Sequence, residues 1–97
     1  MMITLYRTDS IGASHYYTLH DRQGHLFSEY SFTTAWGRNL SASREKVYQF
    51  KSRAAMDAKI RRILKKKIAG GYRVLYSYLR SGEMRDVGPV LRVNAVK

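Results

Sequence analysis

One segment in the middle of the chain constrains the fold most, because it reads as a helix with a clear start and a clear end. Ser52 is a suitable N-cap, no Gly or Pro follows it up to residue 69, and Gly70-Gly71 provides the stop. The apolar residues of this segment recur at helical spacing and form one stripe, made up of Met56, Ile60, Ile63, Leu64 and Ile68. The chain should therefore contain one amphipathic helix that covers an apolar surface.

Strand-like segments on both sides of this helix can supply that surface. The final apolar segment, 87–96, contains Pro89 and is predicted to form an edge strand. We expect an α+β fold, a small and mostly antiparallel sheet with one basic amphipathic helix packed on one face. The other expected strands are 2–6, 15–20, 26–36, 47–50 and 72–79, with a hairpin turn at 21–24 and a loop at 39–43.

Two of these strands carry alternating aromatic residues. On the strand 26–36, one face should present Tyr30, Phe32, Thr34 and Trp36. On the strand 72–79, the alternating residues are Tyr72, Tyr76 and Tyr78. We expect these three tyrosines to pack against the helix, with stacking on nucleic-acid bases as the alternative.

Length and composition are those of one folded domain. The chain has 97 residues, so we expect a single domain over 1–97 in which 79–97 is a C-terminal extension. The absence of cysteine excludes disulfides and thiolate zinc sites. No stretch approaches the roughly 20 apolar residues that span a bilayer, and residues 1–5 lack a secretory signal pattern. A cytoplasmic location without a membrane partner is therefore expected.

Charge is the first indication of function. Eighteen Lys and Arg residues face seven Asp and Glu residues, which gives a formal net charge of +11. Such an excess repels itself and is relieved by an anionic partner, most commonly DNA or RNA. Within the predicted helix, Lys59, Arg62 and Lys66 lie on one face that could follow a phosphate backbone. The alternatives are a solvated outer face and a membrane-surface helix, and the latter fits less well because the apolar stripe has no aromatic residue.

The only tryptophan is followed by Gly and Arg, as Trp36-Gly37-Arg38. The indole offers a flat face for stacking on a sugar or base, and the guanidinium offers a fork that suits phosphate. Gly37 allows a sharp turn or a close backbone approach. Taken alone, the tripeptide favours the plainer interpretation that Trp36 belongs to the core, as large aromatic residues usually do.

The surrounding residues change that balance, because the chain resembles the WGR domain family, which is named for this tripeptide. The resemblance covers about residues 5–78 and rests on Leu5-Tyr6-Arg7, Tyr16-Tyr17, Trp36-Gly37-Arg38, Phe50, Ser52, Ala55, Lys67 and Gly71-Tyr72. It implies a small antiparallel sheet with one helix. It also implies a module that binds nucleic acid and carries no catalytic site of its own.

The resemblance further implies roles for the residues of the motif. WGR domains occur in poly(ADP-ribose) polymerases, where they bind DNA next to a break and dock neighbouring domains, and they also occur alone in bacteria. In the polymerases the motif Trp packs against the sugar of a terminal nucleotide, and the motif Arg organises contacts to DNA and partner domains. By resemblance these roles fall on Trp36 and Arg38. The family usually continues the motif with glycines, whereas residues 39–44 contain none, so the loop should follow a different path.

The predicted function is a DNA-binding module that contacts the phosphate backbone with low sequence specificity, at DNA ends or internally. RNA is the alternative target, and no cofactor is expected. The residues expected to bind nucleic acid are Trp36, Gly37, Arg38, Arg44, Lys59, Arg62, Lys66, Lys67 and Tyr72.

Two other functions compete with this one. A protein-interaction adaptor is the first, because family members also dock neighbouring domains. A small metal-independent ribonuclease is the second, for which the conceivable residues are His20, Tyr72, Arg73 and Arg80. No nucleophile motif or phosphate-binding glycine loop occurs in the sequence. We also expect no metal site, because two of the three histidines, His15 and His20, are five positions apart and would point to opposite faces of a strand.

Overall fold

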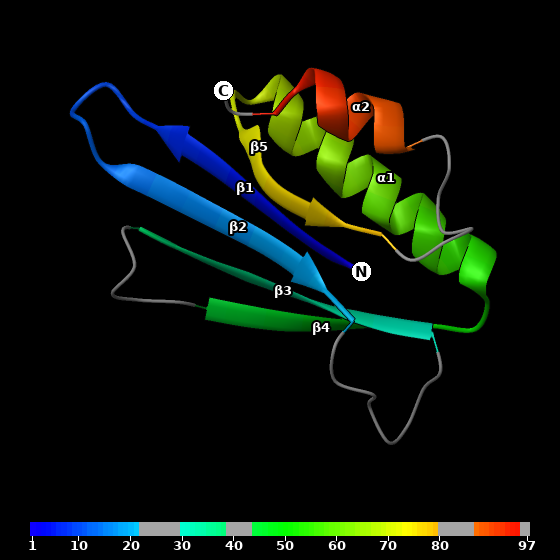
Figure 1. The fold of residues 1–97 in the computed structure, drawn as a ribbon. Helices are drawn as coiled ribbons and strands as arrows, with labels where there is room; N and C mark the ends of the chain where they lie inside the picture. Colours follow the sequence, from blue (N-terminus) through cyan, green and yellow to red (C-terminus); the bar gives the residue numbers. More distant parts are fainter. Residues whose placement is uncertain (22–29, 39–43, 80–86, 96–97) are drawn as a thin grey trace.

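The computed structural model describes residues 1–21, 30–38, 44–79 and 87–95. Five strands form one sheet in the order β4-β3-β2-β1-β5, and every neighbouring pair is antiparallel (Figure 1). The elements are β1 (Met2–Thr8), β2 (Ser14–His20), β3 (Tyr30–Arg38), β4 (Arg44–Phe50), α1 (Arg53–Ala69), β5 (Arg73–Tyr78) and α2 (Val87–Val93). The expected α+β fold is confirmed. Neither described helix is long and apolar enough to cross a membrane.

The long helix α1 begins and ends where local chemistry places its ends. Ser52 has an extended backbone (φ −149°), and its hydroxyl accepts a hydrogen bond of 3.1 Å from the Ala55 backbone amide. At the other end, the Gly70 amide donates to the carbonyls of Lys66 and Lys67, and Gly71 adopts a φ of +100° that favours glycine. The helix predicted from Ser52 to Gly70-Gly71 is therefore confirmed.

Removing this cap should destabilise the protein measurably. We expect Ser52→Ala to lower the free energy of unfolding by about 1 kcal/mol, because the Ala55 amide loses its acceptor. Ser52→Asp should retain most of the stability, because a carboxylate can accept the same bond. Urea denaturation monitored by circular dichroism measures both variants, and an unchanged midpoint for Ser52→Ala would contradict the capping role.

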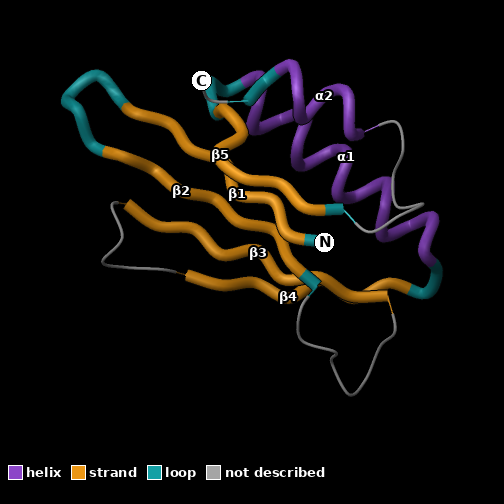
Figure 2. The backbone as a smooth tube through the Cα atoms, in the orientation of Figure 1, coloured by secondary structure: helices purple, strands orange, loops and turns teal. Residues whose placement is uncertain are grey.

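The core lies between α1 and one face of the sheet. Helices α1 and α2 lie on the same side of the sheet, with α1 packed on β3 and β4 and α2 on β5 (Figures 1 and 2). Phe32 is fully buried, and its ring stacks on those of Tyr48 and Phe50 at centroid distances of 5.0 and 5.8 Å. The other core residues from the sheet and α1 include Ile3, Leu5, Leu19, Val74, Met56, Ile60, Ile63 and Leu64.

The prediction of an edge strand over 87–96 is wrong for residues 87–93, which form α2. Pro89 is the third residue of this helix, where its missing N–H removes no intrahelical hydrogen bond. Val87 and Leu91, four positions apart, are buried by the packing. The chain then returns to β5, since the Val74 amide donates to the Asn94 carbonyl and Ala95 forms a parallel bridge with Val74. Parts of other expected elements, at 22–29 and 39–43, lie outside the described residues.

The expected packing of three tyrosines against the helix is wrong for two of them. The register between β1 and β5 shifts at Leu75, which is skipped in the pairing, and this bulge reverses the alternation along β5. Tyr76 and Tyr78 consequently lie on the face away from the helices, 53% and 55% exposed. Tyr72 lies on the helix side of the sheet, where Arg7 is placed over its ring.

Candidate nucleic-acid interface

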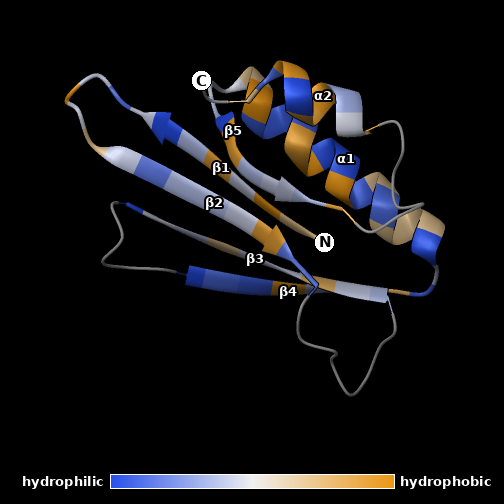
Figure 3. Cartoon of the chain, viewed as in Figure 1, coloured by the Kyte–Doolittle hydropathy of each residue, from blue (hydrophilic) through white to orange (hydrophobic). Residues whose placement is uncertain are grey.

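Four strands change in the same way along the face that α1 covers. On this face, one end of each strand carries apolar residues under the helices, and the other end carries basic or aromatic residues beyond them. Figure 3 shows this change along β1 and β2, which pass from orange near the N-terminus toward white and blue near their shared hairpin. From the covered end outward, the residues are Ile3, Leu5 and Arg7 in β1; Leu19, Tyr17 and His15 in β2; Phe32, Thr34, Trp36 and Arg38 in β3; and Phe50, Tyr48, Lys46 and Arg44 in β4.

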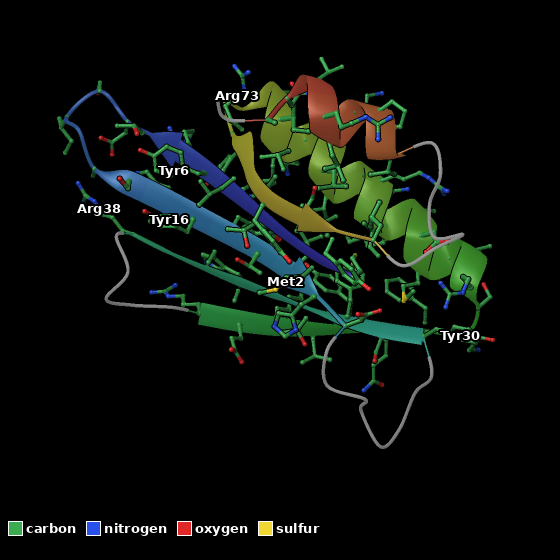
Figure 4. The ribbon with its side chains drawn as sticks, viewed as in Figure 1. Met2, Tyr6, Tyr16, Tyr30, Arg38 and Arg73 are labelled. Atoms are coloured by element: carbon green, nitrogen blue, oxygen red, sulfur yellow. The ribbon has the colours of Figure 1, made fainter. Side chains whose placement is uncertain are left out.

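The antiparallel register brings these ends together. One row across the sheet joins Arg7, His15 and Arg38, which are direct partners in neighbouring strands. The adjacent row joins Tyr17 and Trp36, and continues to Arg44. Because directly opposite residues point to the same face, both rows face the side of the sheet that carries α1. Figure 4 shows Arg38 at one end of β3 and Tyr30 at the other, near the start of α1.

Trp36 lies at the boundary between the core and this surface. The indole is half-buried and stacks on Tyr17, with ring centroids 6.0 Å apart and ring planes at 22°. It also lines two hollows, of about 280 and 350 Å³. The first hollow is lined by His15, Tyr16, Trp36, Gly37, Arg38, Arg44 and Tyr72, and the second by Tyr17, Trp36, Lys46, Tyr48 and Lys67. The indole therefore packs against the core and still presents a surface that a ligand can reach.

Helix α1 adds two lysines to the surface. The Nζ of Lys67 lies 4.5 Å from the ring centroid of Tyr17 and 5.6 Å from that of Tyr72. The Nζ of Lys59 lies 5.4 Å from the ring centroid of Tyr48. Lys59 and Lys67, eight positions apart, are about 80° apart around the helix axis, and each reaches an aromatic ring of the sheet. The aromatic rings hold these ammonium groups in place through cation–π contacts.

Lys67 is the most electrostatically perturbed of these cations. Partial burial lowers the pKa of its ammonium group, and the neighbouring positive charges of Lys66 and Arg7 lower the pKa further. The folded chain therefore holds this charge at a cost, in a place where an anion would relieve it.

Within the described residues, the cations of this site are not neutralised by acidic side chains. In the part of the chain that the structure describes, no carboxylate forms an ion pair with the site cations Arg7, Arg38, Arg44, Lys46, Lys59 or Lys67. We call this set, together with Trp36, the basic surface. Unpaired cations held close together attract a polyanion more strongly than the same charges scattered over the molecule.

A hairpin turn orders one wall of the first hollow. The Asp9 carboxylate accepts hydrogen bonds from the backbone amides of Ile11 and Ala13, and its other oxygen lies 2.9 Å from Nε2 of His15. The hydrogen bond with His15, helped by the two amides, lowers the pKa of Asp9. The turn between β1 and β2 thereby fixes the position of the His15 ring that lines the hollow.

The chain that forms this surface matches a known protein family. A family model described as the WGR domain matches residues 1–77. The chain belongs to the WGR domain family. A search of curated proteins and a search of solved structures found no match. WGR domains in general are nucleic-acid-binding modules, and in poly(ADP-ribose) polymerases they are non-catalytic.

The residues expected to bind nucleic acid fall into two groups in this WGR domain. Seven of the nine are at or beside the two hollows, namely Trp36, Gly37, Arg38, Arg44, Lys59, Lys67 and Tyr72. The other two, Arg62 and Lys66, are exposed on α1 and line neither hollow. Of the three residues on the predicted basic face of the helix, Lys59, Arg62 and Lys66, only Lys59 therefore lies at the site.

Sequence reasoning missed several residues at the site of this WGR domain, Tyr16 in the lining of the first hollow among them. Arg7, His15, Tyr17, Lys46 and Tyr48 enter it through the strand register or through cation–π contacts. A signal for β4 was present, because Arg44, Lys46 and Tyr48 alternate and must share a face. No local pattern could show that Arg7 and His15 lie beside Arg38, since this depends on which strands pair.

Among the described residues of this WGR domain, no three His, Asp or Glu side chains lie together in a way that could hold a metal ion. His15 and His20 lie on opposite faces of β2, as their spacing predicted. His25 lies outside the described residues.

Proposed function

We propose that this WGR domain is a non-catalytic DNA-binding module that contacts the phosphate backbone with low sequence specificity. The observation that carries this proposal is the basic surface, in which cations from four elements, without an ion pair among the described residues, lie on the side of the sheet that also presents the half-exposed indole. Phosphates spaced along a duplex match cations spread over neighbouring strand ends, and each neutralised phosphate releases counterions.

Different residues of the basic surface have different tasks in this proposal. Arg38 and Arg44 bind phosphate oxygens at the outer hollow, because guanidinium groups can donate two parallel hydrogen bonds. Lys67 and Lys59 contribute charge from the helix side. Trp36 stacks on a deoxyribose or a terminal base, which the adjoining hollows leave room to approach.

Low sequence specificity follows from which residues of α1 reach the basic surface. Its apolar side is buried on the sheet, and the residues that reach the basic surface are two lysines. Lysine and arginine contacts to phosphate position a protein on DNA but do not read base edges. The helix is not presented to a major groove as a recognition helix is.

The fold separates the residues that the ribonuclease alternative requires. Tyr72 lies on the helix side of the sheet, whereas His20 and Arg73 lie on the other face. The guanidinium of Arg73 donates to the carbonyls of Asn94 and Ala95, and Arg80 lies outside the described residues. Acid–base catalysis needs its groups within reach of one substrate, which His20 and Tyr72 are not.

Fluorescence anisotropy with labelled oligonucleotides tests the proposal. We expect affinity for a blunt duplex to fall steeply as salt concentration rises, and to be equal for scrambled sequences of the same length. A duplex closed at both ends by hairpin loops should bind more weakly if Trp36 stacks on a terminal nucleotide. Single-stranded DNA and duplex RNA serve as comparisons for the choice of target. Absence of salt-dependent binding to every one of these molecules would refute the proposal.

The lowered pKa of Lys67 predicts how DNA binding changes with pH. Above the pKa of Lys67 in the free folded protein, binding must restore a proton, because a nearby phosphate raises that pKa again. We therefore expect affinity to decrease as the pH rises through the range below the ordinary lysine pKa of roughly 10.4.

Lys67→Arg is the matched variant, because arginine stays charged throughout this range. Its affinity should change less with pH than that of the unmodified protein, as measured by anisotropy at constant ionic strength. Identical pH profiles for the two proteins would show that Lys67 does not contact the bound DNA.

A further inference from the structure

A second recessed surface lies between α1 and α2. It is a groove of about 450 Å³, which is within the size range of ligand-binding pockets. Leu64 and Ile68 of α1 form one wall, and Val87 and Val90 of α2 form the other. Arg61 and Lys65 of α1 also line it, and no described residue that lines it is acidic.

The groove and the basic surface use different sides of α1. Ile68 comes nine positions after Lys59, which places it about 180° around the helix axis. The groove is predominantly apolar, whereas the basic surface consists of cations on aromatic rings. The two surfaces can therefore be occupied at the same time by different ligands.

The α2 wall belongs to a part of the chain that the family match does not cover. The match ends at residue 77, and α2 begins at Val87. On this wall, Val90 lines the groove and is 44% exposed. Its exposed side chain extends the apolar surface of the groove that a partner could cover.

We propose that this groove binds a short amphipathic helix of a partner protein that carries acidic side chains. Apolar residues at helical spacing would fill the space between Ile68 and Val90, in the manner of a helix bound in a groove. The ammonium group of Lys65 at the rim selects carboxylates next to those anchors. This surface would give the module a protein partner in addition to DNA.

Two other occupants fit this groove less well. A second copy of the chain also carries a net charge of +11, and a symmetric contact through this groove would bring the two Lys65 side chains close together. A nucleic acid would place phosphates against the valines of α2, which offer them no hydrogen bonds. An acidic amphipathic segment satisfies both the apolar walls and the basic rim.

The test uses synthetic helical peptides and the full chain. The first peptide carries leucines at helical spacing flanked by glutamates, the second has lysines in place of the glutamates, and the third has serines in place of the leucines. NMR chemical-shift changes and anisotropy should show binding of the first peptide at the groove, with little binding of the other two.

Two variants of α2 provide a matched pair. Val90→Asp lies in the groove and Val93→Asp lies outside it, but both place the same charge at an exposed position of one helix. We expect Val90→Asp to weaken binding of the acidic peptide about tenfold or more, and Val93→Asp to have little effect. Lys65→Glu should weaken it as well, without an effect on DNA affinity. Circular dichroism confirms that each variant is folded.

Several results would overturn this inference. They are failure of the acidic peptide to bind, equal loss of binding in the two aspartate variants, and shift changes confined to the basic surface. Sedimentation that shows a dimer which Val90→Asp abolishes would assign the groove to a second copy instead. None of these outcomes bears on DNA binding, which the separate oligonucleotide titrations measure.

Discussion

Replacement of Trp36 by alanine should weaken binding of duplex DNA by about tenfold to a hundredfold, because stacking on an aromatic side chain contributes roughly 1–3 kcal/mol per base. The variant should still fold, since the indole is only half-buried and lies at the edge of the core. Trp36→Phe should bind with intermediate affinity, because it keeps a smaller ring in the same place. Anisotropy measures the affinities, and thermal denaturation measures the stabilities.

Tyr30 provides the control for this experiment. It is also half-buried, packs against the same core, and lies at the opposite end of β3 from the basic surface (Figure 4). Tyr30→Ala should therefore reduce stability without reducing the affinity of the folded protein for DNA. If Trp36→Ala behaves like Tyr30→Ala in both measurements, the indole has a structural role only.

Removal of three cations from the basic surface should have the larger effect. We expect Arg38→Ala, Arg44→Ala and Lys67→Ala in combination to reduce the slope of log affinity against log salt by about 2.7, at roughly 0.9 for each lost phosphate contact. At low salt the affinity should fall by two or more orders of magnitude. Stability should stay the same or increase, because the substitutions relieve repulsion among unpaired charges.

The matched control removes the same charge elsewhere. Lys51, Arg53 and Lys65 are exposed and line neither hollow around Trp36. Their combined replacement by alanine lowers the net charge equally and should leave most of the salt dependence intact. If the two triple variants lose affinity to the same extent, net charge alone attracts the DNA and the basic surface has no special part.

Local patterns in the sequence predicted most of the fold. Ser52 and Gly70-Gly71 determine the ends of α1 through backbone hydrogen bonds within a few residues, so their effect is visible in the sequence. The shared face of β3 follows from the period of two that any strand imposes.

The errors arose where tertiary structure overrides a local pattern. Proline is unfavourable in the interior of a helix but tolerated in its first turn, where Pro89 lies. The burial of Val87 and Leu91 makes this helix favourable. The bulge at Leu75 depends on how β5 docks on β1, and it moves Tyr76 to the opposite face. Neither effect has a signature within its own segment.

The site was predicted in part for a related reason. Trp36, Gly37 and Arg38 form a contiguous motif that sequence comparison can find. Lys67 was found through its place in a basic helix, but its contact with Tyr17 depends on how α1 crosses the sheet. The pairing of Arg7 with His15 and of His15 with Arg38 is a property of the assembled sheet.

Because residue type changes from apolar to basic along each of these strands, one end of a strand serves folding and the other end serves binding. In β3, Phe32 maintains the core and Arg38, six positions later, faces the solvent. Substitutions at the outer ends can therefore alter what the protein recognises while the inner halves keep it folded. A scaffold organised in this way can acquire new ligands over evolution, or in the laboratory, at little risk to its own integrity.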